Sequence, residues 1–233
     1  MSPKSTPAAV LLLAACACFA QSGVAPLPPP PQPAPKPPKR ILGIIPNYRT
    51  TPATAQYMPI SSREKWKLAA QDAFDPGSFI LAAGFAGQGA LSRNEPSFGH
   101  GVPGYARYFA AAYGDVAIGD FMTGAIYPSL LHQDPRYFRL GTGSTGTRLR
   151  HAVTQIFWTR TDSGGHQFNY SEIAGNATAA AIGTAYYPSN RTAGAVASKW
   201  GVQVGVDILG NILKEFWPDV DRKITHKPKS ASP

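Results

Sequence analysis

Segments rich in Ala, Gly and larger apolar residues alternate with short polar loops along most of the chain. Within these segments apolar residues recur every three or four positions, and almost no stretch shows the period of two that is typical of half-buried strands. The pattern therefore predicts an all-α fold, a compact bundle of five or six Gly/Ala-rich helices. The expected helices cover residues 61–74, 76–92, 104–131, 147–159, 171–190 and 192–217.

Local start and stop signals support these boundaries. Ser61 or Ser62 can cap the first helix, and Asp75-Pro76 combines a favourable N-cap residue with a proline at the first helical position. Pro218 is expected to stop the last helix, because a proline inside a helix removes a hydrogen bond and clashes with the preceding turn.

The last expected helix has a polar stripe with a spacing of four residues. Its members are Lys199, Gln203, Asp207, Asn211 and Glu215, with Lys214 beside them. One interpretation is a stripe that faces water. The other is an internal polar ladder that faces two acids of the 104–131 helix, and it predicts a buried polar network of Asp115, Asp120, Lys199, Asp207 and Asn211. A carboxylate among apolar helices must be paired or neutralised, because an unpaired charge costs several kcal/mol.

Glycine is frequent inside the apolar segments, although it costs about 1 kcal/mol relative to alanine in a helix in water. Gly201 and Gly205 form a GxxxG pair, and small residues at this spacing let helices approach closely in membrane bundles. No apolar segment reaches about 20 uninterrupted residues. The pattern leaves open a bundle associated with a membrane and a tightly packed soluble bundle.

The two ends differ from the body in composition. Residues 1–20 have a basic start, a short apolar core and small residues before Gln21, as a secretory signal peptide does. Leu13-Ala14-Ala15-Cys16 also resembles a bacterial lipobox, so Cys16 is a candidate for lipidation. Residues 21–40 form a Pro-rich linker that is expected to be disordered, followed by a helical domain at 41–218 and a disordered basic tail at 219–233.

The net charge of +9 comes mostly from these ends. Residues 41–218 contain fourteen Lys and Arg against eleven Asp and Glu, a surplus of three that gives no reason to expect nucleic acid binding. The basic ends favour a membrane surface or anionic lipid as partner. Both cysteines, Cys16 and Cys18, lie in the signal, so the mature chain has no thiol for catalysis or metal binding.

Basic residues gather around the segment SLLHQDPRYFR and the glycines after it. Arg136, Arg139, Arg148, Arg150 and His151 are a candidate anion-binding cluster, because several cationic groups near backbone N–H donors can hold a phosphate or carboxylate. The alternative is that Asp134-Pro135 starts a short turn whose arginines face water or lipid headgroups. No activated nucleophile accompanies His132 and Asp134, so we assign no catalytic residue.

Other chemical motifs are incomplete. None of the five histidines has a metal-ligand spacing, and no phosphate-binding loop, dinucleotide fingerprint or nucleophile elbow is present, so we predict no metal and no cofactor. The segment DSGGH at 162–166 resembles the PSGH motif of type 2 phosphatidate phosphatases, with Asp in place of Pro, an extra Gly and none of the family's other motifs.

Four longer motifs carry a second resemblance: IIPNYR, QDPRYFR, NYSEIAGN and KEFWPD. They resemble those of a family of uncharacterised exported bacterial proteins, over most of residues 40–220. The resemblance implies export and a helical body, and brings no activity or substrate with it.

The sequence thus predicts an exported protein of a bacterial periplasm or outer membrane, a non-enzymatic helical bundle associated with a membrane. The alternative is a lipid-binding or anion-binding protein, or a phosphatase-like enzyme, that uses the Arg136–His151 region. Oligomeric state does not follow from the pattern.

Overall fold

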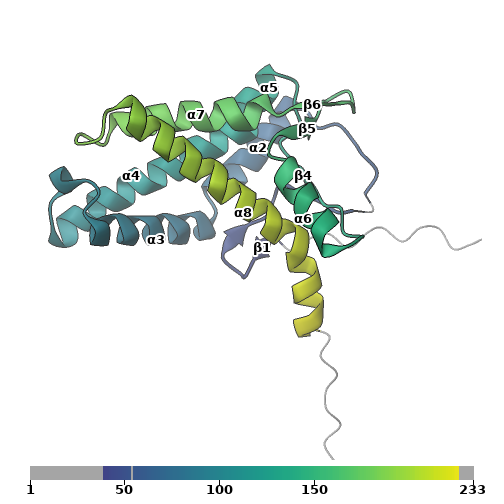
Figure 1. The fold of residues 1–233 in the computed structure, drawn as a ribbon, viewed down its shortest axis with the longest axis horizontal. Coiled ribbons are helices and arrows are strands. Elements are labelled where there is room, and N and C mark those ends of the chain that lie inside the picture. The colour runs from purple at the N-terminus through teal and green to yellow at the C-terminus, as the bar shows by residue number, and fades with distance from the viewer. Residues whose placement is uncertain (1–38, 54, 226–233) are drawn as a thin grey trace, which may run out of the picture. The chain divides into compact units, whose positions relative to one another are not determined.

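A computed structural model describes residues 39–53 and 55–225, and these residues are mostly helical (Figure 1). The helical prediction is thus confirmed in its coarse form, and short strands that it did not include are added. The helices are α2 (Ser62–Ala73), α3 (Pro76–Ser92), α4 (Gly101–Phe121), α5 (Tyr127–Leu130), α6 (Thr145–Thr154), α7 (Tyr170–Ala185) and α8 (Ala193–Thr225), with a 3-10 turn at Pro96–Phe98 and a π turn at Met122–Ile126. The signal, Cys16 and most of the Pro-rich segment lie outside the described residues.

The short strands join distant parts of the chain in pairs. They are β1 (Arg40–Ile41), β2 (Ile45–Pro46), β3 (Thr50–Thr51), β4 (Tyr137–Phe138), β5 (Trp158–Arg160) and β6 (His166–Phe168). β1 pairs antiparallel with β2, β3 parallel with β4, and β5 antiparallel with β6. The β3–β4 pair ties the segment before α2 to the QDPRYFR motif.

Two predicted helix starts are confirmed by their caps. Ser61 and Glu64 form a capping box at α2, in which each side chain accepts a hydrogen bond from the backbone N–H of the other residue. Asp75 caps α3 by accepting from the N–H of Gly77 at 2.7 Å. Arg40 donates to the same carboxylate and is the main reason that its pKa falls to about 2.

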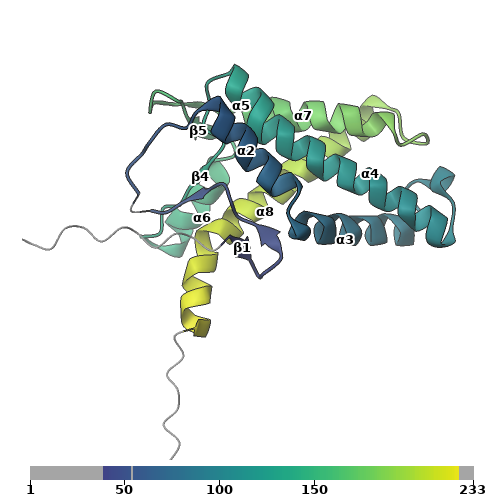
Figure 2. The same ribbon diagram turned by 180° about the vertical axis from the view of Figure 1, so that it is seen from behind.

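The helices pack around small side chains. α3 lies along α4, α4 along α7, and α7 along α8, as Figures 1 and 2 show from opposite sides. The main apolar core lies between α3, the 3-10 turn and α4, and it consists of Ala82, Ala86, Phe98, Tyr108, Ala111 and Ala112. Alanines at these contacts bring the backbones close together, as the Gly/Ala-rich pattern predicts.

Glycine lets neighbouring segments approach closely at Gly175 and Gly124, but not at the GxxxG pair. A Cβ atom on Gly175 would lie 3.1 Å from Thr123, and one on Gly124 would lie 2.9 Å from the guanidinium of Arg49. Gly201 and Gly205 face open space within the described part of the chain, so their spacing does not serve packing inside this unit.

The last helix is longer than predicted. α8 passes through Pro218 and continues to Thr225, so the boundary at residue 218 is wrong and residues 219–225 are helical rather than a disordered tail. Arg139 and Arg148 explain why the helix tolerates this proline. Both donate to the carbonyl of Glu215 and to the carboxylate of Asp219, and so hold the turn that contains Pro218.

The helix predicted for 147–159 is too long at its C-terminal end. α6 ends at Thr154, and Trp158–Arg160 form β5 instead. The residues at 156–159 are β-branched or aromatic, which favours an extended strand when a partner such as β6 is available.

Candidate functional site

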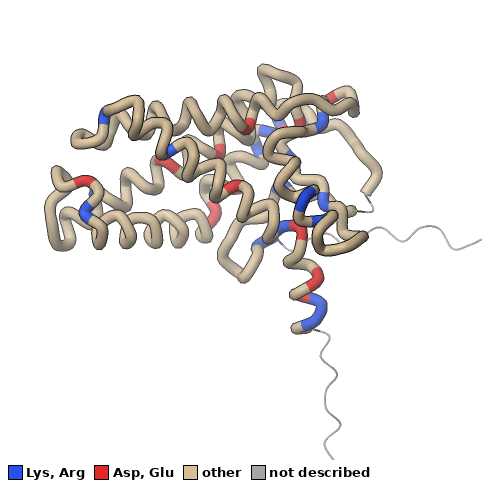
Figure 3. The backbone as a smooth tube through the Cα atoms, in the orientation of Figure 1, with Lys and Arg blue, Asp and Glu red and all other residues tan. Residues whose placement is uncertain are grey.

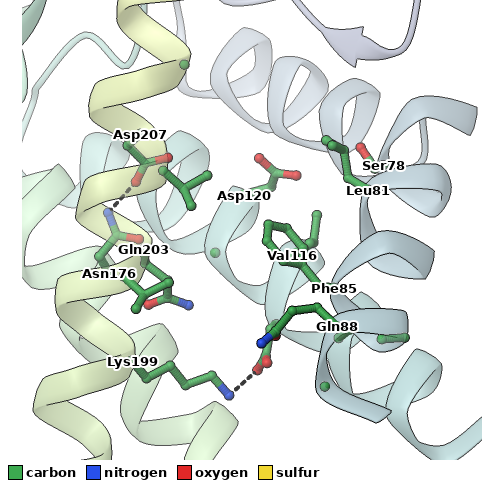
Figure 4. A pocket seen from close by; sticks show the side chains of 18 of the residues that line it. Ser78, Leu81, Phe85, Gln88, Val116, Asp120, Asn176, Lys199, Gln203 and Asp207 are labelled. Atoms are coloured by element: carbon green, nitrogen blue, oxygen red, sulfur yellow. Dashed lines mark hydrogen bonds and ion pairs between the residues drawn. The ribbon is translucent and has the colours of Figure 1, made fainter. Parts of the chain in front are cut away.

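The polar stripe of α8 faces the interior of the bundle. Lys199, Gln203, Asp207 and Lys214 line a cavity between α8, α4 and α3, as Figure 4 shows for the first three. A further side of the helix, which does not line the cavity, is apolar and exposed, with Leu209 at 61 % of its full accessibility. The helix is therefore amphipathic with its polar side inward, which agrees with the internal ladder among the two interpretations.

The cavity has a volume of about 570 Å³. That size falls in the range of about 300–1,000 Å³ that is usual for pockets that bind drug-sized molecules. Its apolar wall includes Leu81, Phe85, Val116, Val202 and Val206. Its charged wall comprises Arg49, Asp72, Asp115, Asp120, Lys199, Asp207 and Lys214.

Arg49 is the centre of the charged end. It follows β2 in the chain and donates to Asp72 of α2 and, at 2.8 Å, to Asp120 of α4. Burial lowers the pKa of this guanidinium, but the two carboxylates more than compensate, and its pKa is raised. Its position depends on Gly124, because any larger side chain there would meet the guanidinium.

Burial lowers the pKa of the Arg49 guanidinium but raises the pKa of the Asp120 carboxyl group. It raises the pKa of this carboxyl group to about 8, although Arg49 acts against the shift. Glu172, at the start of α7, is affected in the same way, because burial and the neighbouring Asp207 raise its pKa well above the ordinary value. Asn176 of α7 joins this helix to α8 by donating a hydrogen bond to Asp207 at 2.8 Å, and it also donates to Glu172 of its own helix at 3.3 Å.

Lys214 completes this end of the cavity. Its ammonium group makes no ion pair within 4 Å among the described residues, and burial followed by repulsion from Arg49 lowers its pKa. The charged groups near it also include Asp72, Asp207 and Glu172, which act against that shift.

A second ion pair lies further along the cavity. Lys199 of α8 contacts Asp115 of α4 at 2.7 Å, and the hydroxyl groups of Tyr186 and Tyr187 donate to the same carboxylate. A Cβ atom on Gly183 of α7 would collide with both Asp115 and Lys199, so only glycine leaves room for this pair.

Two atoms of the cavity wall lack hydrogen-bond partners. The Oδ1 atom of Asp72 and the Oε1 atom of Gln203 are buried and have no donor among the described residues. Asp72 is only 6 % exposed. A buried acceptor without a donor costs about 1–3 kcal/mol, and such groups are uncommon in folded proteins.

The predicted polar network is thus divided. Lys199 pairs with Asp115, while Asp120 and Asp207 lie at the charged end with Arg49 and Lys214. Asn211 lies elsewhere, where it donates to the carbonyl of Ala152 at 3.4 Å.

The predicted anion-binding residues are mostly engaged with carboxylates. Arg136 pairs with Asp134 at 2.6 Å, and Arg139 and Arg148 pair with Asp219. Arg148 also pairs with Glu215, at 2.7 Å. The anion-binding function of this region stays a prediction.

The remaining members of that cluster do not converge on one point. The Nε2 atom of His151 lies 2.8 Å from the carbonyl of Phe138, and Arg150 is exposed. Tyr137 and Phe138 form β4 rather than anchoring a free turn, and Tyr137 is buried. The DSGGH segment starts with Asp162, whose carboxylate accepts from the buried Lys65.

Sequence reasoning missed several residues of the cavity. The sequence pattern assigns neither Arg49 nor Asp72 to a site, and it places Lys214 only beside the polar stripe. One available signal was the position of Asp72 in an Ala-rich helix, where an acid on the buried side requires a partner. No group of three or more His, Cys, Asp or Glu residues in the described part of the chain has the arrangement of a metal site.

Comparison with known proteins gives no homology on which to base a function. No family model matches the chain, and no curated protein or solved structure is significantly similar to it.

Proposed function

We propose that this protein is a non-enzymatic binding protein of the bacterial cell envelope that holds a small ligand in the cavity between α3, α4, α7 and α8. The same proposal includes export of the protein to the periplasm or outer membrane. It also includes a relation to the exported bacterial family, and both parts rest on the sequence motifs.

The observation that carries the proposal is the charged wall of the cavity. Burying charges is expensive, and replacing a buried ion pair with apolar residues is often neutral or stabilising. A bundle that needed only stability would gain by filling this space. Charged groups that line an accessible cavity, among them Asp120 with its raised pKa, are instead typical of a functional site.

We propose binding rather than catalysis because the polar groups of the wall are mainly arranged in ion pairs. Arg49 is engaged by two carboxylates and Lys199 by one. The histidines His132, between α5 and β4, and His166, at the start of β6, do not line the cavity.

A cavity-filling variant tests the proposal. Gly119 of α4 lines the cavity, and a Cβ atom there would meet no atom within 4 Å, so Gly119→Leu would extend a side chain into the cavity. Gly84 of α3 also faces open space but is not part of the cavity wall, which makes Gly84→Leu the matched control. Both replacements raise helix propensity by a similar amount.

The readout is thermal stabilisation by a panel of cationic, neutral and anionic amphiphiles. We expect at least one class to raise the Tm of the wild type and of Gly84→Leu, and to lose this effect in Gly119→Leu. Equal responses in all three proteins, or no response to any class, would contradict a ligand site in the cavity.

Association with a membrane is a second part of the function, and the outer surface of the bundle favours it. Large apolar side chains that do not line the cavity are exposed on the two helices that flank it: Phe79, Ile80 and Leu91 on α3, and Leu209 on α8. Phe85, Val202 and Val206, which line the cavity, are also partly exposed. Figure 3 shows that α3 carries no charged residue along its length. An apolar surface of this extent is typical of a contact with lipid or protein.

The lengths and compositions of the helices bear on how the protein contacts a membrane. Among residues 39–53 and 55–225, no helix is both long and apolar enough to cross a bilayer. We therefore propose that this face lies against the surface of a membrane.

Vesicle flotation tests this second part. A charge at Leu209 would have to be desolvated at the contact, so Leu209→Asp should reduce the bound fraction several-fold. Leu149→Asp on α6 adds the same charge at another exposed leucine and should leave binding unchanged. If both variants bind vesicles as well as the wild type does, the exposed face of α8 does not contact the membrane.

A further inference from the structure

The two unsatisfied atoms of the cavity wall are both acceptors. Asp72 Oδ1 and Gln203 Oε1 come from different helices, α2 and α8, and both residues line the cavity. A ligand that satisfies these two acceptors must supply hydrogen-bond donors, since acceptors cannot bond to one another.

The balance of charge at this end of the cavity favours a positive ligand. Four carboxyl groups face one another here, from Asp72, Asp120, Glu172 and Asp207, and the cations near them are Arg49 and Lys214. When all of these groups are ionised, the carboxylates exceed the cations by two. Arg49 is already engaged by two carboxylates and is not free to receive an anion.

The apolar residues of the cavity wall favour a ligand with an apolar body. Leu81, Phe85 and Val116 line the same cavity from α3 and α4, across from α8 (Figure 4). Val202 and Val206 of α8 also line it. A molecule that fills the cavity therefore contacts these apolar groups as well as the charged end around Arg49, while Asp115 further along is already paired with Lys199.

We propose that the ligand is an organic cation, an ammonium or guanidinium group carried on an apolar body, whose head is bound by Asp72 and Gln203. This inference rests on the proposed function of the cavity. The cation donates to the two unpartnered oxygens and favours the ionised form of Asp120, and the apolar body displaces water from the wall of α3 and α8.

Binding of a cation has a consequence for protons. Asp120 has a pKa of about 8, so it holds a proton at neutral pH, and burial raises the pKa of Glu172 as well. A positive charge nearby favours the ionised form, so the ligand releases protons on binding. The charged groups that face Asp120 come from every neighbouring element: Arg49 after β2, Asp72 on α2, Glu172 on α7, and Asp207 and Lys214 on α8.

The test uses probes that share one apolar body. Octylguanidinium keeps its charge across the pH range, 1-octanol is neutral and octanoate is an anion. Calorimetric titration of the full chain should give an affinity for octylguanidinium at least tenfold above that for the other two. Titration in buffers of different ionisation enthalpy should show proton release at pH 7 and tighter binding at pH 8 than at pH 6.

Two variants connect the selectivity to the named residues. Asp72→Asn should weaken octylguanidinium binding at least tenfold and leave octanol binding unchanged. Glu64→Gln removes the same charge from the exposed start of α2, outside the cavity, and should change neither. If Asp72→Asn fails to fold, Gln203→Leu removes the second acceptor and should weaken octylguanidinium binding by a smaller factor.

The possible failures are distinguishable. If octanol or octanoate binds as tightly as octylguanidinium, and Gly119→Leu abolishes that binding, the cation is wrong and the cavity remains a binding site. If no probe binds, both proposals fail. Vesicles of phosphatidylethanolamine provide a separate arm, and a bound lipid in native mass spectrometry would identify an aminolipid rather than a free amine as the source of the cation.

Discussion

Glu215, at the junction of β4, α6 and α8, and Asp120, in the cavity wall, are both shielded carboxyl groups, but they meet different numbers of donors. Glu215 is fully buried and accepts from Tyr137, Leu140, Gly141 and Arg148 at 2.7–2.9 Å. Asp120 receives a hydrogen bond from Arg49 alone among the described residues. Two carboxyl groups of one helical unit thus have opposite environments.

The pKa directions follow from this difference. Burial alone would raise the pKa of Glu215, but the hydrogen bond from Arg148 and those from the β4–α6 segment lower it. At Asp120 burial prevails, and the pKa rises to about 8. A saturated carboxylate holds elements together, whereas an unsaturated one keeps capacity for a proton or a ligand. The comparison separates a structural junction from a candidate binding site.

Removing the carboxylate of the junction should have the largest effect. Glu215→Ala leaves Arg148 buried with one partner fewer and removes the acceptor of three further donors. Breaking a buried ion pair of this kind costs about 3–5 kcal/mol, so we expect a loss of that size in the free energy of unfolding. Urea denaturation measures it, and a loss below about 1 kcal/mol would mean that the junction is not a structural anchor.

Raising the pH should destabilise the cavity by a smaller amount. Asp120 keeps its proton up to about pH 8 in the folded protein, while the unfolded chain loses it near pH 4. The unfolded state therefore binds fewer protons between these values, and stability falls as the pH rises through that window, by roughly 2 kcal/mol between pH 6 and pH 8. Glu172 acts in the same direction.

The matched variant for this prediction is Asp120→Asn, which removes the titrating group. Its free energy of unfolding should depend less on pH than that of the wild type over the same range. If wild type and variant show the same dependence, Asp120 is ionised at neutral pH in the folded protein, contrary to its proposed environment.

A substitution at Gly183 should have the smallest of the three effects. Gly183→Ala forces Asp115 and Lys199 apart, and overpacking of this kind costs at least about 1 kcal/mol. Gly201→Ala is the control on α8, where open space and higher helix propensity should give a gain of about 0.5–1 kcal/mol. Changes of the same sign in both variants would show that the Asp115–Lys199 pair does not require this glycine.

Much of the fold follows from local signals in the sequence. The caps at Ser61 and Asp75 are set by residues within one turn of each helix start, and both were predictable. The expectation that Pro218 ends the last helix is wrong, and the contacts on either side of this proline come from Arg139 and Arg148, which lie about 70–80 residues away in the chain.

The candidate site was only half predictable for the same reason. The spacing of Lys199, Gln203 and Asp207 identified the polar stripe of α8, but both faces of that helix can be buried or exposed, and the neighbours decide which. Arg49 gave no signal at all, because its partners Asp72 and Asp120 are brought to it by the packing of α2 and α4.

Titration of the carboxyl groups by carbon NMR tests the central comparison most directly. In the wild-type protein, assigned through Asp120→Asn and Glu215→Gln, the account predicts that Asp120 titrates near pH 8 while Glu215 titrates below its ordinary range. If both groups titrate together near pH 4, burial does not raise the pKa of Asp120, and the proposed difference between the cavity and the junction is wrong.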